Sequence, residues 1–225
     1  MVNKMLKQLK LVIFDLDQTL VNTVKRMYVI YNQARKELGL NPVDWETFYY
    51  LFEHDKLSYD VPESLLERLW DILRSIYCSV ILEEDGPIDG AEGVLKLLKE
   101  KNIIVVVTTG RRCSPEDIWK ELYLYGLAEY VDDVYTAIYS QNEDIPFERS
   151  TVLKMILEKY SVSSNEAIFV ADYFPDMYAG KKVGILTIGV KTGLKQEKDL
   201  KLHGADYVLN SISELPELLR RIGAL

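Results

Sequence analysis

Residues 11–20 have the sequence LVIFDLDQTL, an apolar run that ends abruptly in two carboxylates, Asp15 and Asp17. Continuous Val, Ile and Phe runs of this length are typical of strands that are buried on both faces of a parallel sheet. An acid directly after such a strand lies at its carboxyl end, where open α/β sheets bind ligands. Two acids this close also occur in ordinary loops, so further motifs must distinguish a functional site from a surface turn.

Composition limits the class of protein. The chain has 225 residues, of which 48% are hydrophobic and 28% charged, and this predicts a substantial core in one large or two small domains. A formal net charge of −8 argues against a nucleic-acid partner, which favours a basic surface. An anionic substrate stays open, because a bound cation can reverse the local charge.

The sequence shows neither of the patterns typical of a membrane span or a signal peptide. No segment approaches the ~20 apolar residues of a membrane span, so no membrane partner is expected. The first apolar run is broken at Asp15, which makes it too short for a signal peptide. Two cysteines, Cys78 and Cys113, are too few for a disulfide framework and indicate a reducing compartment. We therefore predict a cytoplasmic protein, present as a monomer or homodimer.

The segment 22–86 contains helical patterns and no convincing strand. Apolar and aromatic residues recur at helical spacing over 24–38, 44–53 and 62–77. Pro62 suits the first turn of the third helix. We predict that 22–86 is an inserted helical domain whose aromatic stripes form its core. Residues 1–21 and 87–225 would form the main domain.

Helix and strand patterns alternate after this insertion. The expected helices lie at 93–101, 114–126 and 151–160, and the expected strands at 103–107, 133–137, 167–171, 184–190 and 206–209. This alternation predicts an α/β fold with a doubly wound, Rossmann-like parallel sheet. Three buried strands end in polar residues that would meet at one sheet edge: Asp15 with Asp17, Thr108 with Thr109, and Asp172.

With these residues assembled, the chain from about Lys10 onward resembles the haloacid dehalogenase superfamily of aspartate-dependent phosphotransferases. DLDQTL is similar to the first motif of the superfamily, VVVTT to the second, and VADYFPDMYAGKKVGI to the fourth. A helical insertion between the first and second motifs resembles the C1 type of cap. The match is to the phosphatase branch that includes phosphoglycolate phosphatases.

The resemblance implies a hydrolase that acts on phosphoric monoester bonds. Asp15 would be the nucleophile that forms an aspartyl-phosphate. Asp17 would protonate the leaving alkoxide and then deprotonate the water that hydrolyses the intermediate. The dehalogenase branch has no acid at this second position, because halide needs no proton to leave. Asp17 therefore favours phosphoryl chemistry.

Repulsion between a carboxylate and a phosphate calls for a cation. Two like charges ~4 Å apart at an effective dielectric of ~20 cost about 4 kcal/mol. Mg²⁺ is the expected cofactor, because it is a hard ion that bridges carboxylates and phosphate while keeping waters. The resemblance implies Asp15, Asp172 and the backbone carbonyl of Asp17 as its ligands, with Asp176 ligating directly or indirectly.

The resemblance further implies that the phosphate is bound by Thr108 and by the backbone amides of Thr109 and Gly110. The third motif usually supplies a Lys, often followed by Pro, and this sequence has no such pair. Arg149 is the best substitute and Lys154 a weaker one, while Arg149 is equally well explained as a solvated helix-start residue. An Arg holds carboxylate and phosphate through a two-pronged contact that Lys cannot make.

Three further residues depart from or extend the family pattern. Gln18 stands where Gly is commonest in the first motif, and Ala171 where Gly often precedes the fourth; both fit a turn or a strand end. Arg111 follows the phosphate-binding strand and could reach an anionic substrate. The sequence favours a solvated loop for it.

Together these features predict a Mg²⁺-dependent phosphatase for a small phosphorylated metabolite, with the helical cap closing over the substrate and excluding water. Phosphoglycolate, sugar phosphates and nucleotides all remain candidates. One alternative is a phosphomutase of the β-phosphoglucomutase type, which shares both aspartates. Another is a catalytically weak protein that only binds a phosphorylated ligand, as the absent third-motif Lys would allow.

Overall fold

A six-stranded parallel sheet forms the centre of the main domain in the computed structural model, which describes residues 8–137 and 148–225. The strand order is β5-β4-β1-β6-β7-β8. The strands are β1 (Leu11–Asp15), β4 (Ile104–Thr108), β5 (Asp133–Tyr135), β6 (Ala167–Ala171), β7 (Leu186–Val190) and β8 (Tyr207–Leu209). The predicted doubly wound α/β fold is confirmed.

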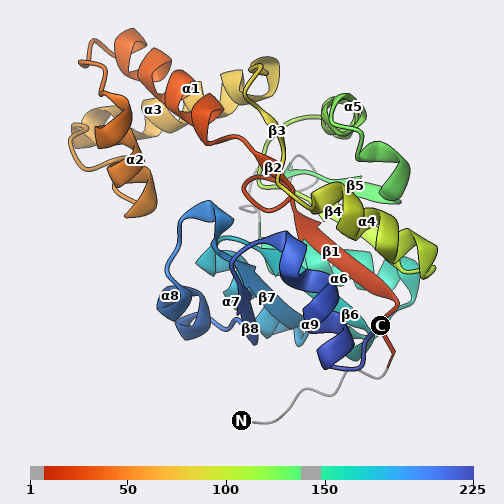
Figure 1. The fold of residues 1–225 in the computed structure, drawn as a ribbon. Helices are drawn as coiled ribbons and strands as arrows, with labels where there is room; N and C mark the ends of the chain where they lie inside the picture. Colours follow the sequence, from red (N-terminus) through yellow and green to blue (C-terminus); the bar gives the residue numbers. More distant parts are fainter. Residues whose placement is uncertain (1–7, 138–147) are drawn as a thin grey trace. The chain divides into compact units, whose positions relative to one another are not determined.

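Helices cover both faces of this sheet. They are α4 (Ala91–Glu100), α5 (Pro115–Leu124), α6 (Arg149–Tyr160), α7 (Phe174–Val183), α8 (Glu197–Leu202) and α9 (Leu215–Arg221). Crossovers between parallel strands are right-handed as a rule, and the strand order reverses direction at β1. The connecting helices α4 and α5 are therefore expected on one face and α6, α7 and α8 on the other, while α9 follows the last strand. In Figure 1, α4 and α9 lie in front of the sheet and α6 lies behind it.

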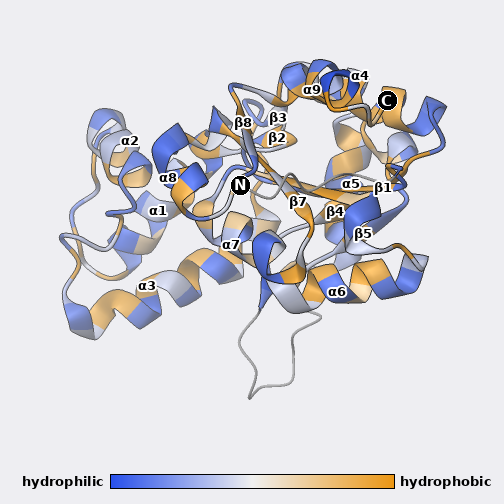
Figure 2. Cartoon of the chain, turned by 90° about the horizontal axis from the view of Figure 1, so that it is seen from below, coloured by the Kyte–Doolittle hydropathy of each residue, from blue (hydrophilic) through white to orange (hydrophobic). Residues whose placement is uncertain are grey.

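The apolar run of the first motif becomes the middle of the core. The side chains of Leu11, Val12, Ile13 and Phe14 are fully buried, because β1 is a central strand, paired with β4 and β6, in a sheet that helices cover on both faces. In Figure 2 the colouring shows hydrophobic residues along the central strands of the sheet. Burial on both sides explains why this strand lacks the alternation of a half-exposed strand.

Several helix ends follow local capping rules. Ser114 caps α5 by accepting a hydrogen bond from the Asp117 amide, and Pro115 occupies the first turn, as predicted. Helix α6 begins at Arg149, two residues earlier than the apolar pattern indicated. Pro62 is the N-cap of its helix, one position before the first turn, with an extended ψ of 136°. The polar sequence at residues 141–144 lies outside the described residues.

The chain divides into two compact units, residues 1–21 with 87–225 and residues 22–86. The second unit contains α1 (Val24–Glu37), α2 (Trp45–Glu53) and α3 (Glu63–Ile76). Two short strands, β2 (Val21–Asn22) and β3 (Gly86–Pro87), pair where the chain passes between the units. The five described 3₁₀ turns are η1 (Tyr77–Ser79), η2 (Ala128–Tyr130), η4 (Ser164–Glu166), η5 (Lys191–Gly193) and η6 (Ile212–Glu214).

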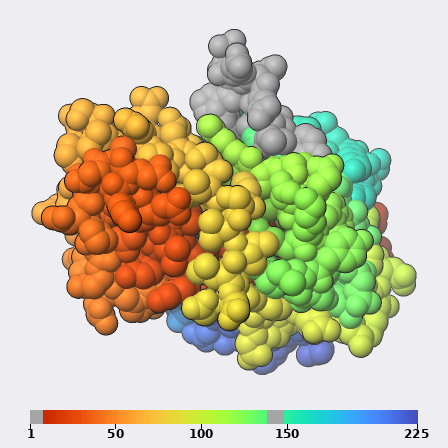
Figure 3. All heavy atoms as spheres, turned by 90° about the horizontal axis from the view of Figure 1, so that it is seen from above, coloured from red at the N-terminus to blue at the C-terminus, as the bar shows by residue number. Residues whose placement is uncertain are grey.

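The helical unit has an aromatic core of its own. Helices α1 and α3 lie side by side, as Figures 1 and 3 show. Tyr31 and Phe48 are fully buried, and their ring centroids are 5.8 Å apart. The Tyr31 hydroxyl donates to the Leu57 carbonyl at 2.7 Å and lies 3.0 Å from Nη1 of Arg35, so its polar end is satisfied inside the core. The aromatic stripes are therefore core packing, as predicted.

Two further observations bear on the expected environment. Among residues 8–137 and 148–225, no helix has both the length and the apolar character needed to cross a bilayer. Neither cysteine is a free thiol in this part of the chain. The small number of cysteines is therefore no argument for a reducing compartment.

Candidate active site

The candidate site lies at the carboxyl end of β1. Asp15 is the last residue of the strand and pairs in register with Thr108 at the end of β4. Asp172 directly follows β6, the other neighbour of β1. The polar residues that the sequence predicted at one sheet edge are therefore brought to the same edge by parallel pairing.

A tight turn follows Asp15. The Gln18 amide donates to the Val21 carbonyl at 2.7 Å, and the Leu20 amide to the Leu16 carbonyl at 2.9 Å. Gln18 has a φ of 58°, in the left-handed region that glycine adopts most easily. This geometry explains why glycine is common here in the family. The Thr192 hydroxyl, in the 3₁₀ turn that follows β7, donates to the Gln18 carbonyl and helps to hold this turn in place.

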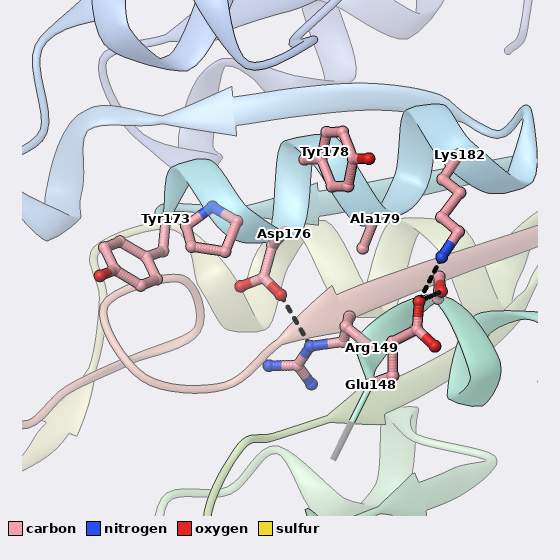
Figure 4. A pocket seen from close by; sticks show the side chains of 9 residues that line it. Glu148, Arg149, Tyr173, Asp176, Tyr178, Ala179 and Lys182 are labelled. Atoms are coloured by element: carbon pink, nitrogen blue, oxygen red, sulfur yellow. Dashed lines mark hydrogen bonds and ion pairs between the residues drawn. The ribbon is translucent and has the colours of Figure 1, made fainter. Parts of the chain in front are cut away.

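Arg149 connects three polar residues of the site. Its Nη2 donates to Oδ1 of Asp15 at 2.9 Å, its Nε to Oδ1 of Asp176 at 2.7 Å, and its Nη1 to Oγ1 of Thr108 at 2.8 Å. Figure 4 shows the side chain reaching from the start of α6 toward Asp176 of α7. Arg149 is thus no solvated helix-start residue, whereas Lys154 is exposed on α6.

Burial shapes the electrostatics of the carboxylates. Burial raises the pKa of Asp15 well above its usual value; Arg149 opposes this rise, and Asp176 and Asp172 add to it. Burial, followed by the nearby charge of Asp176, raises the pKa of Asp172 to about 8. The pKa of Arg149 is raised despite its own burial, because Asp176 and Asp15 face it. The protein groups alone therefore do not fully compensate these carboxylates in their ionised form.

The donor set at this edge fits a hard divalent cation. Asp15 and Asp172 offer buried carboxylate oxygens, and uncompensated buried anions favour a bound cation. In the part of the chain that the structure describes, no three His, Cys, Asp or Glu side chains form a metal cluster. Mg²⁺ does not need one, because it is usually held by one or two carboxylates with waters and a phosphate.

Close contacts fix the position of Asp172. The Thr19 hydroxyl lies 3.4 Å from Oδ1 of Asp172. On the other side, a Cβ built on Gly193 would stand 1.8 Å from Oδ2 of Asp172, so only glycine leaves room for this carboxylate. Asp176 is held differently, since its Oδ1 already accepts a hydrogen bond from Arg149. These contacts make Asp172 the better-placed candidate for direct coordination.

The predicted phosphate-binding residues have different surroundings. Thr108 is fully buried and its hydroxyl oxygen accepts from Arg149, which leaves the hydroxyl hydrogen available. A Cβ on Gly110 would be 3.9 Å from Nη2 of Arg149, so this backbone lies beside the guanidinium. The Thr109 amide donates to the Tyr135 carbonyl at 2.9 Å, so the prediction that this amide binds phosphate needs correction.

Arg111 is the residue that the sequence interpretation missed. Instead of lying in a solvated loop it is 8% exposed, and its guanidinium contacts both carboxylate oxygens of Asp17. A buried Glu121 on α5 accepts from the remaining nitrogen, Nη1, at 2.7 Å. One signal was available in the sequence. Glu121 stands among the apolar residues of the helix that begins shortly after Arg111, and an acid on an apolar helix face indicates a buried cationic partner.

A pocket of about 360 Å³ lies next to Arg149 and Asp176, between the start of α6 and the first turns of α7 (Figure 4). Tyr173, Pro175 and Tyr178 supply much of its wall. At one end Lys182 pairs with Glu148, and this contact lowers the pKa of Glu148 to about 2. The pocket therefore lies beside Asp176 and Arg149 of the candidate site, next to α7.

Comparison with known families and structures agrees with this arrangement. The model of the haloacid dehalogenase-like hydrolase family matches residues 12–190. That range includes every acid described above, together with Arg149 and the helical unit. The chain belongs to the haloacid dehalogenase-like hydrolase family, and the resemblance inferred from its motifs is confirmed.

Individual relatives span almost the whole chain. A glyceraldehyde 3-phosphate phosphatase of Pyrococcus furiosus is 30% identical, covering 96% of this chain and 95% of its own length. A phosphoglycolate phosphatase of Vibrio parahaemolyticus is 24% identical over 95% of this chain and 97% of its own. A haloacid dehalogenase-like structure from Streptococcus pneumoniae superposes with a TM-score of 0.78 at 20% identity, covering 94% of this chain and 98% of that one, which supports the fold.

Proposed function

We propose that this hydrolase is a Mg²⁺-dependent phosphatase that cleaves a small phosphomonoester through an aspartyl-phosphate on Asp15. The observation that carries the proposal is the three-way contact of Arg149 with Asp15, Asp176 and Thr108. It joins the expected nucleophile, a fourth-motif acid and the expected phosphate-binding hydroxyl through one cation. A purely structural ion pair would not require a hydroxyl at the end of a neighbouring strand.

The first half-reaction forms the covalent intermediate. Arg149 contacts Oδ1 of Asp15, so Oδ2 is the oxygen that attacks the phosphorus. The bond between phosphorus and the ester oxygen breaks, and Asp17 gives its proton to that leaving oxygen. Arg149 and the Thr108 hydroxyl stabilise the charge on the phosphoryl oxygens during the transfer.

The second half-reaction returns the enzyme to its starting state. Asp17, now a carboxylate, takes a proton from a water molecule as the oxygen of that water attacks the phosphorus. The phosphorus–oxygen bond to Asp15 breaks, and inorganic phosphate is released. Asp15 is then an ionised carboxylate again beside Arg149, and Asp17 is again protonated for the next substrate.

Asp15, Asp172 and the backbone carbonyl of Asp17 would hold Mg²⁺, with Asp176 ligating directly or indirectly. The ion would offset the repulsion between the attacking carboxylate and the phosphate. The unfavourable ionisation of the buried Asp172 in the absence of a cation, and its close fit against Gly193, support this assignment. Residues 22–86 would act as the C1-type cap that excludes water during the transfer.

The substrate we propose is a small phosphorylated metabolite. The two relatives described above carry the names of phosphatases for glyceraldehyde 3-phosphate and for phosphoglycolate, both compact molecules with one phosphate. Their names differ, so the class of small phosphomonoester is what the relatives share. A screen of such compounds follows once turnover has been established.

The test is phosphate release from p-nitrophenyl phosphate by the wild type with Mg²⁺, by the wild type with EDTA, and by Asp15→Asn. We expect turnover only in the first case. Asp89→Asn, a change of the same chemistry at an exposed position, serves as the control and should retain full activity. The proposal would be contradicted if Asp89→Asn lost its activity while Asp15→Asn kept it, or if the wild type were equally active in EDTA.

The same assay separates the alternatives. A phosphomutase would transfer labelled phosphate from a sugar phosphate donor to a second sugar phosphate instead of to water. A protein that only binds its ligand would show no turnover with p-nitrophenyl phosphate or a phosphometabolite panel, while still folding and binding Mg²⁺. Either result would replace the phosphatase proposal.

A further inference from the structure

Arg111 makes a two-pronged ion pair with the expected acid–base residue. Its Nε lies 2.8 Å from Oδ2 of Asp17 and its Nη2 lies 2.6 Å from Oδ1. A planar guanidinium that contacts both oxygens defines the plane of the carboxylate as well as its distance. The Asp17 side chain is 26% exposed, so it faces the accessible side of the sheet edge and is still fixed in orientation.

Arg111 is itself held from several directions. Its amide donates to the Thr109 hydroxyl at 3.2 Å, and its carbonyl accepts from the Ala137 amide at 2.9 Å. Its third guanidinium nitrogen, Nη1, donates to Oε1 of Glu121 at 2.7 Å. Because both the backbone and the tip of the side chain are anchored, the guanidinium is already in place before any substrate binds.

Glu121 makes this arrangement more than a chance surface contact. Its side chain is 3% exposed and lies on α5, whose inner face otherwise carries the buried apolar residues Ile118 and Leu122. A buried carboxylate is costly unless a cation accompanies it. Glu121 and Arg111 therefore form a fixed pair within the core, and the remaining fork of Arg111 points at Asp17.

We propose that Arg111 is a positioning residue, anchored by Glu121, that orients the Asp17 carboxyl group for proton transfer to the leaving oxygen of the substrate. The inference rests on the proposed phosphatase function and adds a residue pair that the motifs do not contain. Each carboxylate oxygen has about two lone-pair sites, so the fork can occupy one on each oxygen and leave the other for the proton.

The proposal predicts a dependence on the leaving group. A p-nitrophenolate ion leaves without a proton, whereas the alkoxide of benzyl phosphate must be protonated as its bond to phosphorus breaks. Misplacing the acid therefore slows the benzyl ester far more than the nitrophenyl ester. The quantity to compare is the ratio of kcat/KM for the two esters, because kcat/KM reports the steps up to phosphoryl transfer to Asp15.

The central variant is Arg111→Lys, which keeps the positive charge and loses the two-pronged contact. General acid catalysis contributes roughly 10²–10⁴-fold, so we expect kcat/KM for benzyl phosphate to fall by at least about tenfold, with a change under about threefold for p-nitrophenyl phosphate. Asp17→Asn should show the same selectivity with a larger loss. Glu121→Gln, which is outside the site, should show it with a smaller loss.

Folding is followed by circular dichroism, because Arg111→Lys weakens the partner of a buried Glu121. If that variant does not fold, the double variant Arg111→Met/Glu121→Met removes both buried charges and should give the same selective loss. An equal fall for both esters, or an unchanged ratio in the folded variants, would overturn the inference. A wild type inactive on both esters would instead overturn the phosphatase function, and this inference with it.

Discussion

Nη2 of Arg149 donates a hydrogen bond to Oδ1 of Asp15 at 2.9 Å, although the two residues are 134 positions apart in the chain. Asp15 ends β1, and Arg149 is the first residue of α6. We propose that Arg149 takes the role for which the family pattern has a Lys. A guanidinium is suited to it, because three acceptors surround it and an ammonium is a point charge that cannot match a planar fork.

Replacing Arg149 tests this assignment. Hydrogen bonds to charged groups contribute about 1.5–3 kcal/mol each, so losing one costs roughly 10–100-fold in rate where it acts in the transition state. We expect kcat/KM for p-nitrophenyl phosphate to fall about tenfold in Arg149→Lys and by at least about 100-fold in Arg149→Met. Lys154→Met, in the exposed alternative, should stay near wild type. A larger loss in that variant would reverse the assignment.

Removing a proposed metal ligand tests the cation site without using activity. Asp172→Asn leaves the size of the side chain unchanged and removes its charge. Because even outer-shell partners of a metal are worth 10–100-fold in affinity, we expect the Mg²⁺ dissociation constant from titration calorimetry to rise by at least about tenfold. Addition of Mg²⁺ should also raise the melting temperature of the wild type more than that of the variant. Unchanged Mg²⁺ affinity would remove Asp172 from the ligand set.

Two glycine substitutions separate a steric effect at the site from a general one. In Gly193→Ala the new methyl group would stand 1.8 Å from Oδ2 of Asp172, so we expect loss of turnover and weaker Mg²⁺ binding. In Gly93→Ala, within α4, nothing lies within 4 Å of the new methyl group. This control should keep full activity and gain about 0.5–1 kcal/mol of stability in urea denaturation, because alanine favours a helix. Full activity in Gly193→Ala would contradict the steric argument.

Glu166 predicts a pH dependence of stability. Contacts with Lys10, at 2.7 Å, and with Ser163 lower the pKa of Glu166 to about 2 from a usual value of 4.5. A lowered folded-state pKa means that the ionised group stabilises the native state above about pH 4.5, and that this stabilisation is lost as the pH falls from there toward about 2.

The measurement for Glu166 is the urea midpoint of wild type and Glu166→Gln at pH 7 and at pH 3. The wild type should be the more stable protein at pH 7, and the difference should shrink at pH 3. A difference that stays constant or grows at low pH would show that the charge of Glu166 is not responsible. Turnover should be unaffected at pH 7, because Glu166 precedes β6 at the edge opposite the site.

Local patterns were sufficient for the secondary structure around the site. The run before Asp15, the strand before Thr108 and the strand before Asp172 were all predicted, because burial on both faces selects continuous apolar segments. The start of α6 was placed two residues late, because Arg149 interrupts the apolar period that defined the helix. The same error left Arg149 just before the expected helix, where a solvated helix-start residue is an equally good interpretation.

The environment of a side chain was harder to predict than its position. Thr109 follows a predicted strand as expected, but its amide pairs with Tyr135 of the neighbouring strand. Arg111 was assigned to a solvated loop, because arginines are mostly exposed and its partners are distant in sequence. Its contact with Asp17 spans 94 positions, and no local pattern encodes such a separation.

The sequence by itself determined the family, the parallel α/β core and the acids of the first and fourth motifs. These depend on apolar runs and on acids immediately after them, which are local features. Only the tertiary structure decided which cations face those acids. Arg149 and Arg111 acquire their roles through ion pairs across the sheet edge, and the strength of such pairs depends on burial and distance, which exist only once β1, β4 and β6 lie side by side.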